Sequence, residues 1–259
     1  MSPRLLAEQI DATLVLTISN PQFRNALGPA IYTAGIEALN AAEANRDIRA
    51  IIITGEGEHF CAGGNLNRLK DNRAQAPKVQ EDSIEALHTF IECIRNFPKP
   101  VLAAVEGAAA GAGVSLALAC DMVVAADNAK FVMAYSSVAL SPDGGGAWVL
   151  ARSLPRAAAM HMLLSGAPMQ AAQMHSWGLV SHLTQPGQSL SQALSAAAVL
   201  NARAPNVMAS IKELMNDALD TNFTTHLNAE KKHFVRNLHH VNGGEGIDAF
   251  LDKRTPHYK

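Results

Sequence analysis

Two short apolar runs constrain the fold more than any other feature of the sequence. IRAIIITG (48–55) and PVLAAVEG (100–107) each end in glycine, as buried strands do where they enter a turn. Between them, residues 81–97 carry apolar side chains at helical spacing, and Pro98 ends that pattern. Because strands alternate with helices along the chain, we expect an α/β domain.

Other segments extend the same alternation. A strand is predicted at 13–19, a helix at 29–45, a buried helix at 111–120, and short strands within 121–126 and 130–134. The C-terminal third is predicted to be mostly helical, at 155–164, 169–177, 189–203, 205–219, 224–238 and 245–253. A tail made only of helices indicates an appended layer or an oligomerisation element.

Composition excludes several classes of function. The formal net charge of −2 gives no global attraction to nucleic acid or to an anionic membrane. No signal peptide or lipid-spanning run is found, so a soluble, cytoplasmic protein is expected. The three cysteines, Cys61, Cys93 and Cys120, form no metal-binding spacing. They are predicted to be reduced thiols, and no metal site is expected.

Two glycine-rich segments follow strands, at 53–69 and 104–121. The order of Gly107, Gly111 and Gly113 does not match the dinucleotide-binding fingerprint. Each segment alone is explained equally well by tight turns. Together, small residues let backbone N–H groups approach a ligand, and one N–H from each segment can hold the oxyanion formed when a thioester becomes an enolate.

Five motifs lie in order along nearly the whole chain. They are NPQFRNAL (20–27), ITGEGEHFCAGGNL (53–66), AVEGAAAGAGVSLALACDMVVAADNAKF (104–131), LLSGAPMQAAQMHSWGLVSHL (163–183) and AFLDKR (249–254). This set resembles the crotonase superfamily, also called the enoyl-CoA hydratase/isomerase family. The resemblance implies a spiral of repeated ββα units with a C-terminal helical region for trimerisation.

The resemblance also implies how the chain is divided and what it binds. Residues 1–200 would form the core for acyl-CoA binding and catalysis, and residues 201–259 would serve oligomerisation and CoA capping. The expected assembly is a homotrimer or a dimer of trimers. The coenzyme A thioester is the implied substrate, and no separate cofactor is expected.

Site residues carry over from the same motifs. The oxyanion donors are the backbone N–H groups of Gly64 and Ala112, the latter standing where the family usually has glycine. Ala112 would begin a helix, where its N–H has no intrahelical partner. The resemblance implies CoA contacts by Arg24, Ala26, Ala62, Asn65 and Leu66, with Phe250 and Lys253 capping the nucleotide across a subunit boundary. For Arg24 and Lys253 the alternative is a solvated surface cation.

The chain departs from the family pattern at two positions. Hydratases of the family use two glutamates to add water, and this chain has Ser115 and Tyr135 there. Serine without a partner is a poor general base, and a phenol is mostly protonated at neutral pH. Hydration by the two-glutamate route is therefore not expected.

SPDGGGAW (141–148) places Asp143 between a proline and three glycines. Read alone, this string favours a surface turn. Its context, VALSPDGGG (138–146), resembles the aspartate loop of family isomerases, with Ala139 for the usual glycine. Asp143 would move a proton between two carbons of the substrate. Tyr135 is expected either to hydrogen-bond to substrate or Asp143, or to pack, and Ser115 to fill space.

The predicted function is therefore a double-bond shift in an unsaturated acyl-CoA, with a layout nearest to isomerases of aromatic-acid catabolism. The alternative is an enoyl-CoA hydratase, or a ring-opening hydrolase-type relative, in which Asp143 activates water. A non-catalytic or RNA-binding relative is disfavoured, since residues 29–45 contain no Lys or Arg. His59 and Cys61 are expected to act as spacers. Asn67 and Arg68 are expected to lie on the surface, the alternative being that they face the mouth of the pocket. The acyl group and the pathway are not specified by the sequence.

Overall fold

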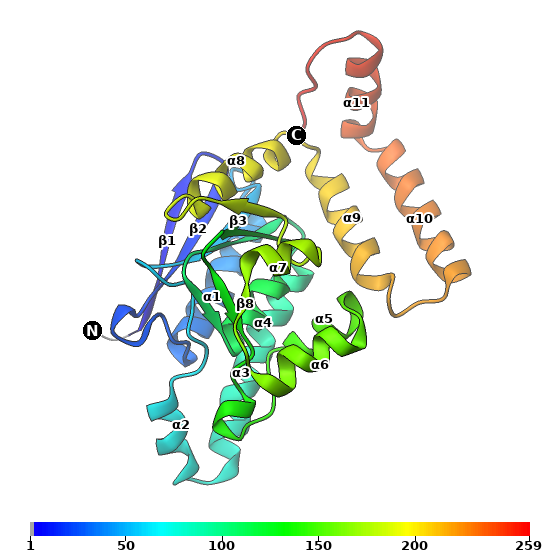
Figure 1. Ribbon diagram of the computed structural model, residues 1–259. Helices are drawn as coiled ribbons and strands as arrows, with labels where there is room; N and C mark the ends of the chain where they lie inside the picture. Colours follow the sequence, from blue (N-terminus) through cyan, green and yellow to red (C-terminus); the bar gives the residue numbers. More distant parts are fainter. Residues whose placement is uncertain (1–2) are drawn as a thin grey trace.

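The central element is a six-stranded sheet, seen in a computed structural model that describes residues 3–259 (Figure 1). Its strands are β1 (Arg4–Ile10), β2 (Thr13–Ser19), β3 (Ala50–Gly55), β4 (Val101–Val105), β6 (Met122–Ala126) and β9 (His182–Thr184), in that spatial order. β1 and β2 are antiparallel and every other neighbouring pair is parallel. The α/β expectation is confirmed.

Both faces of this sheet are covered, which explains the continuous apolar runs of its strands. Alternate residues point to opposite faces. Ile51 and Ile53 belong to the main core, which contains α1 (Pro29–Ala44) and α3 (Pro77–Asn96), whereas Ile52 packs in a smaller cluster with α8 (Ser189–Asn201). The helices α1 and α3 pack against each other at Gly35, where the Phe90 ring occupies the space of a side chain. A Cβ added at Gly35 would lie 2.3 Å from that ring.

A second, three-stranded sheet consists of β5 (Ala108–Ala110), β7 (Lys130–Val132) and β8 (Met169–Gln170). The chain passes from β4 to β5 and then into α4 (Ala112–Ala119), and from β6 to β7 in the same way. Between β3 and α2 (Leu66–Arg73), an extended segment at Cys61 pairs with β5. These repeats are the expected ββα units of the spiral.

The remaining helices follow the spiral core. They are α5 (Gly146–Ser153), α6 (Arg156–Ser165), α7 (Ala171–Ser176), α9 (Pro205–Asp217), α10 (Phe223–Leu238) and α11 (Val241–Leu251), with short 3-10 turns at Pro21–Phe23 and Ser136–Val138. Figure 1 shows α10 and α11 extending away from the sheet. Large apolar side chains stay exposed on this C-terminal part: Met215, Phe223, Phe234, Phe250 and Leu251. In the described part of the chain, no helix is both long and apolar enough to span a membrane.

Several elements differ from the sequence expectation. The edge strand β1 and the helix α2 were not predicted, because β1 is mostly exposed and α2 buries no side chain, so neither shows a clear apolar period. The expected helix at 169–177 begins as strand β8. The helix expected at 245–253 begins earlier, at Val241. Its first turn was missed because it contains glycines, which have low helix propensity.

Candidate active site

Two backbone segments meet beside the second sheet. The Cys61 N–H donates to the Ala108 carbonyl at 3.1 Å, and the Ala110 N–H donates to the Cys61 carbonyl at 2.8 Å. Cys61 thereby pairs with Ala109 in parallel. Gly64 and Ala112 each follow this pair by three residues, so the parallel pairing carries their backbones to the same place.

The contact between the two segments leaves no room for side chains at two glycines. A Cβ at Gly63, whose φ is +82°, would lie 2.5 Å from the Ala110 carbonyl oxygen and 3.1 Å from the Ala112 nitrogen. A Cβ at Gly113 would lie 2.3 Å from the Cys61 carbonyl oxygen. Glycine is therefore required for the segments to approach this closely.

The Gly64 and Ala112 N–H groups are available to a ligand. Within residues 3–259, neither donates a hydrogen bond to a backbone carbonyl. Ala112 is the first residue of α4, where an N–H has no intrahelical acceptor and the helix dipole favours negative charge. Two such donors, brought together by the paired segments, are suited to an anionic oxygen.

Three side chains from three parts of the chain hold the loop that carries Asp143. The Tyr135 hydroxyl donates to Asp143 Oδ1 at 2.5 Å, and the Ser115 hydroxyl donates to the Asp143 carbonyl at 2.9 Å. The Gly144 N–H donates to His88 Nε2 at 3.4 Å. Sequence reasoning missed His88, because one histidine on an amphipathic helix carries no signal of its tertiary partner.

The glycines after Asp143 explain how the loop returns into α5. Gly144 and Gly145 have φ values of +63° and +79°, in the left-handed region that favours glycine. A Cβ at Gly146 would lie 2.5 Å from Ser115 Oγ. The string is therefore a turn, and the same turn points the half-buried Asp143 side chain at Tyr135.

Tyr135 connects the Asp143 loop to the start of α4. A Cβ at Gly111 would lie 3.7 Å from the Tyr135 ring, one residue before Ala112. Burial and the neighbouring Asp143 raise the pKa of Tyr135 well above its ordinary value. The phenol therefore stays protonated at neutral pH and remains a donor. Ser115 does more than fill space, since its hydroxyl holds the Asp143 backbone.

Comparisons with known proteins identify the family. The family model described as "Enoyl-CoA hydratase/isomerase" matches residues 8–259. The chain belongs to the enoyl-CoA hydratase/isomerase family. It is 34% identical to the 1,2-epoxyphenylacetyl-CoA isomerase of Escherichia coli (strain K12), over 98% of this chain and 97% of that protein. It is 33% identical to the 2,3-dehydroadipyl-CoA hydratase of the same organism, over 98% of each chain.

A solved structure confirms the crotonase fold. The enoyl-CoA hydratase from Polaromonas sp. JS666 superposes with a TM-score of 0.98 at 62% identity, covering 99% of this chain and 100% of that one. The chain is therefore an acyl-CoA enzyme of the enoyl-CoA hydratase/isomerase family. Its relatives carry both isomerase and hydratase names.

Five of the residues expected at coenzyme A gather at one edge of this family fold. The Ala62 N–H donates to the Arg24 carbonyl at 2.9 Å, and the Leu27 N–H donates to the Gly63 carbonyl at 2.7 Å. The loop at 20–27 thus lies along the segment that ends in Gly64. The residues collected there are Arg24, Ala26, Ala62, Asn65 and Leu66, with Arg24 and Leu66 exposed and Ala26 buried.

The other two expected CoA contacts lie elsewhere in the chain. Phe250, which is 82% exposed, belongs to α11, and Lys253 follows that helix. Figure 1 shows α11 and α2 at opposite ends of the molecule. One chain therefore does not bring Phe250 and Lys253 to Arg24, and their capping role stays a prediction about a second subunit.

Cys61 and His59, next to the oxyanion segment, do not form a nucleophile–base pair. Burial raises the pKa of the Cys61 thiol to about 12, and its Sγ accepts from the Gly63 N–H at 3.3 Å. His59 Nδ1 is buried, with no hydrogen-bond partner among the described residues. No nucleophile–base pair is formed here. The chain from residue 3 onward also contains no cluster of three or more His, Cys, Asp or Glu side chains that could hold a metal ion.

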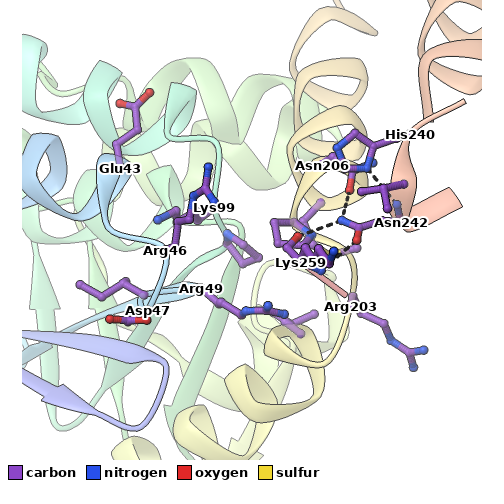
Figure 2. A pocket seen from close by; sticks show the side chains of 16 residues that line it. Glu43, Arg46, Asp47, Arg49, Lys99, Arg203, Asn206, His240, Asn242 and Lys259 are labelled. Carbon is purple, nitrogen blue, oxygen red and sulfur yellow. Dashed lines mark hydrogen bonds between the residues drawn. The ribbon is translucent and has the colours of Figure 1, made fainter. Parts of the chain in front are cut away.

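A cavity of about 760 Å³ lies away from the Asp143 cluster, between the α1–β3 turn and the C-terminal segment (Figure 2). Arg49 donates to the carbonyls of Asn201 and Tyr258, at 3.0 and 2.9 Å. Lys99 Nζ donates to the carbonyls of Ala42 and Asn45, at 2.6 and 2.7 Å. These cations are engaged with backbone carbonyls, so their contacts fasten the chain around the cavity.

Proposed function

We propose that this enzyme shifts a carbon–carbon double bond in an unsaturated acyl-CoA by proton transfer through Asp143. One observation carries the proposal. Ser115 and Tyr135, which stand where the family's hydratases have glutamates, both donate hydrogen bonds to Asp143. Tyr135 holds the carboxylate itself and Ser115 holds the Asp143 backbone carbonyl, so this cluster contains one carboxylate, and one base suffices for isomerisation.

The first step forms an enolate. The Asp143 carboxylate takes a proton from carbon 2 of a 3-enoyl thioester, and the C–H electrons form a double bond between carbons 1 and 2. The thioester carbonyl oxygen becomes an oxyanion, which the N–H groups of Gly64 and Ala112 stabilise. Tyr135 keeps its own proton and orients the carboxylate.

The second step returns the same proton. As the oxyanion reverts to a carbonyl, the carbon 2–carbon 3 double bond forms and carbon 4 takes the proton from Asp143. No atom is gained or lost, and the carboxylate is regenerated. The 34% identical relative is named a 1,2-epoxyphenylacetyl-CoA isomerase, which supports isomerisation of an acyl-CoA, although the group that it rearranges is an epoxide.

The alternative is hydration, or hydrolytic ring opening, with Asp143 activating water. It is supported by the hydratase names of the 33% identical relative and of the 62% identical structure. Hydration must both deprotonate a water and protonate carbon 2. In this cluster Asp143 would have to perform both transfers, because the raised pKa of Tyr135 makes its phenol too weak an acid to protonate carbon.

We also propose which residues bind coenzyme A and how the chains assemble. Arg24, Ala26, Ala62, Asn65 and Leu66 bind coenzyme A, and Phe250 and Lys253 cap its nucleotide from a neighbouring subunit. The exposed apolar side chains of α9 to α11 support a homotrimer or a dimer of trimers. Sedimentation-velocity measurements test this assembly, and a monomer at micromolar concentration would contradict it.

The deciding experiment incubates the protein with 3-hexenoyl-CoA and with crotonyl-CoA in heavy water. We expect the first to become 2-hexenoyl-CoA and the second to gain no water. Asp143→Asn should lower turnover by about 10³-fold while coenzyme A binding persists. Asp127→Asn, which alters an exposed aspartate in a turn, is the matched control. Hydration of crotonyl-CoA without any bond shift would replace the isomerase proposal by the hydratase.

A further inference from the structure

Arg68 is the cation near the oxyanion segment whose hydrogen bonds are incomplete. The sequence favoured a surface position, but the structure places this side chain half-buried on α2. Its guanidinium donates to the Ser83 hydroxyl at 2.5 Å. Its Nε is shielded from solvent and has no acceptor, and no carboxylate in residues 3–259 forms an ion pair with it.

Such an arrangement is costly unless an acceptor arrives. A guanidinium presents its donors as a planar fork, and a buried donor without an acceptor costs free energy. Arg254 shows the satisfied case, because it donates to both oxygens of Glu245 at 2.7 and 2.9 Å. Arg68 lacks the carboxylate that Arg254 has.

The position of Arg68 relates it to the acyl group. It follows Gly64 by four residues, and its Nε lies 4.0 Å from the place that a Cβ at Gly28 would take, next to the bridge that pairs Leu27 with Gly64. Tyr32, buried in the first turn of α1, lies near enough to both Arg68 and Asp143 for each to alter the pKa of its phenol. Tyr32 thus connects Arg68 with the Asp143 side of the site.

Tyr32 adds a second donor. Burial raises the pKa of Tyr32 to about 12, an effect that Arg68 opposes and Asp143 reinforces. The phenol therefore keeps its proton at neutral pH and can donate a hydrogen bond. A planar, negatively charged acceptor would be bound by the guanidinium fork and the phenol together.

We propose that Arg68, with Tyr32 beside it, binds a carboxylate at the far end of the acyl group. The inference rests on the proposed acyl-CoA function and deepens it: the favoured substrates are CoA thioesters of short dicarboxylic acids. The carboxylate supplies the acceptor that Arg68 lacks, while Asp143 acts several carbons away at the thioester end. Because Asp143 and the substrate carboxylate are both negative, Arg68 also separates the two charges.

The test compares two ligands that cannot react. Adipoyl-CoA and hexanoyl-CoA have the same chain length and differ in the terminal carboxylate, and titration calorimetry gives both dissociation constants. In Arg68→Met the ratio of the adipoyl to the hexanoyl constant should rise about 30-fold over wild type. Lys70→Met, an exposed position on the same helix, should leave the ratio within about twofold.

A second Arg68 variant separates the loss of the guanidinium fork from a failure to fold. Arg68→Lys retains the charge without the fork, so its ratio should rise about fivefold, and it serves as the readout should Arg68→Met fail to fold. An unchanged ratio in both Arg68 variants, with hexanoyl-CoA still bound, overturns the inference and leaves the proposed function intact. If neither CoA ester binds the wild-type protein, the proposed function itself fails.

Discussion

The two halves of the site are built in different ways. The segment at 60–64 and the start of α4 are fixed by backbone hydrogen bonds and by glycines that allow close contact. The Asp143 loop is held instead by the side chains of Tyr135, Ser115 and His88. The first half needs small residues, whereas the second needs particular hydroxyl and imidazole groups.

The backbone half of the site would serve any reaction of a thioester, whereas the side-chain half would determine which reaction takes place. In the proposed function, the backbone donors would stabilise any thioester oxyanion, and Ala112 would supply its N–H as well as a glycine. The side chains around Asp143 would decide where a proton is taken and returned, so substitutions there should change the reaction. The first half should therefore fail through added volume, and the second through lost hydrogen bonds.

Among the substitutions that compare the two halves of the site, the largest effect is expected from Gly113→Ala. The new methyl would lie 2.3 Å from the Cys61 carbonyl oxygen, which is backbone and cannot rotate away. The two segments must separate, which displaces the Ala112 donor. We expect kcat/KM to fall by about 10²–10³-fold, and urea titration should show a loss of about 1–3 kcal/mol of unfolding free energy.

Gly244→Ala is the control for this change. Gly244 lies in α11, and a Cβ there would meet nothing within 4 Å. Alanine in a helix should raise the unfolding free energy by about 0.5–1 kcal/mol and leave kcat/KM unchanged. Wild-type activity in Gly113→Ala would show that the paired segments do not fix the donors.

Tyr135→Phe tests the side-chain half with little change in shape. It removes the donor to Asp143 Oδ1, a hydrogen bond to an ionised group. We expect kcat to fall by about 30-fold, with steady-state kinetics showing a smaller change in KM.

The alkaline side gives the complementary test of Tyr135. Because burial and Asp143 raise the pKa of this phenol, it remains protonated as the pH rises through 10, the ordinary value for tyrosine. The ratio of wild-type to Tyr135→Phe rates should therefore stay constant from about pH 7 to 10. A ratio that falls toward one near pH 10 would show that Tyr135 ionises in that range.

Ser115→Ala should have a smaller effect. The hydroxyl donates to the Asp143 carbonyl at 2.9 Å, which is a hydrogen bond between neutral groups. Its loss is expected to lower kcat about fivefold, corresponding to about 1 kcal/mol. Ser195→Ala on the exposed face of α8 should have no effect on initial rates. A loss as large as that of Tyr135→Phe would mean that the loop backbone, and not the carboxylate contact, limits the reaction.

Local patterns predicted much of this arrangement. The strand at 13–19 and the helix at 29–45 have nearly the bounds expected, since buried apolar periods and prolines mark them. The glycine-rich segments predicted a close approach of two backbones, which the pairing of Cys61 with Ala109 confirms, whereas the donor role of Gly64 and Ala112 came from the family resemblance and stays a prediction. The helix α2 was missed, as its side chains are polar and none is buried.

The rest depended on contacts distant in sequence. Nothing local shows that His88 meets Gly144, 56 residues later, or that Ser83 accepts from Arg68. For Tyr135 the sequence left open a bond to Asp143 or simple packing, and the structure shows the bond. Partners of this kind are set by how helices pack on the sheet, which single residues do not encode.

The smallest effect concerns Cys61, which lies within the backbone half of the site. Burial raises the pKa of its thiol to about 12, and only the thiolate is alkylated. With iodoacetamide at pH 8, half-buried Cys93 should react first, while Cys61 and Cys120 react far more slowly in the folded protein, as peptide mass spectrometry would show. Because alkylation of Cys61 requires the segment at 60–64 to leave β5, its rate reports how firmly that pairing holds. Labelling of Cys61 as fast as Cys93 would mean that the backbone half opens readily, and the contrast with the Asp143 loop would fail.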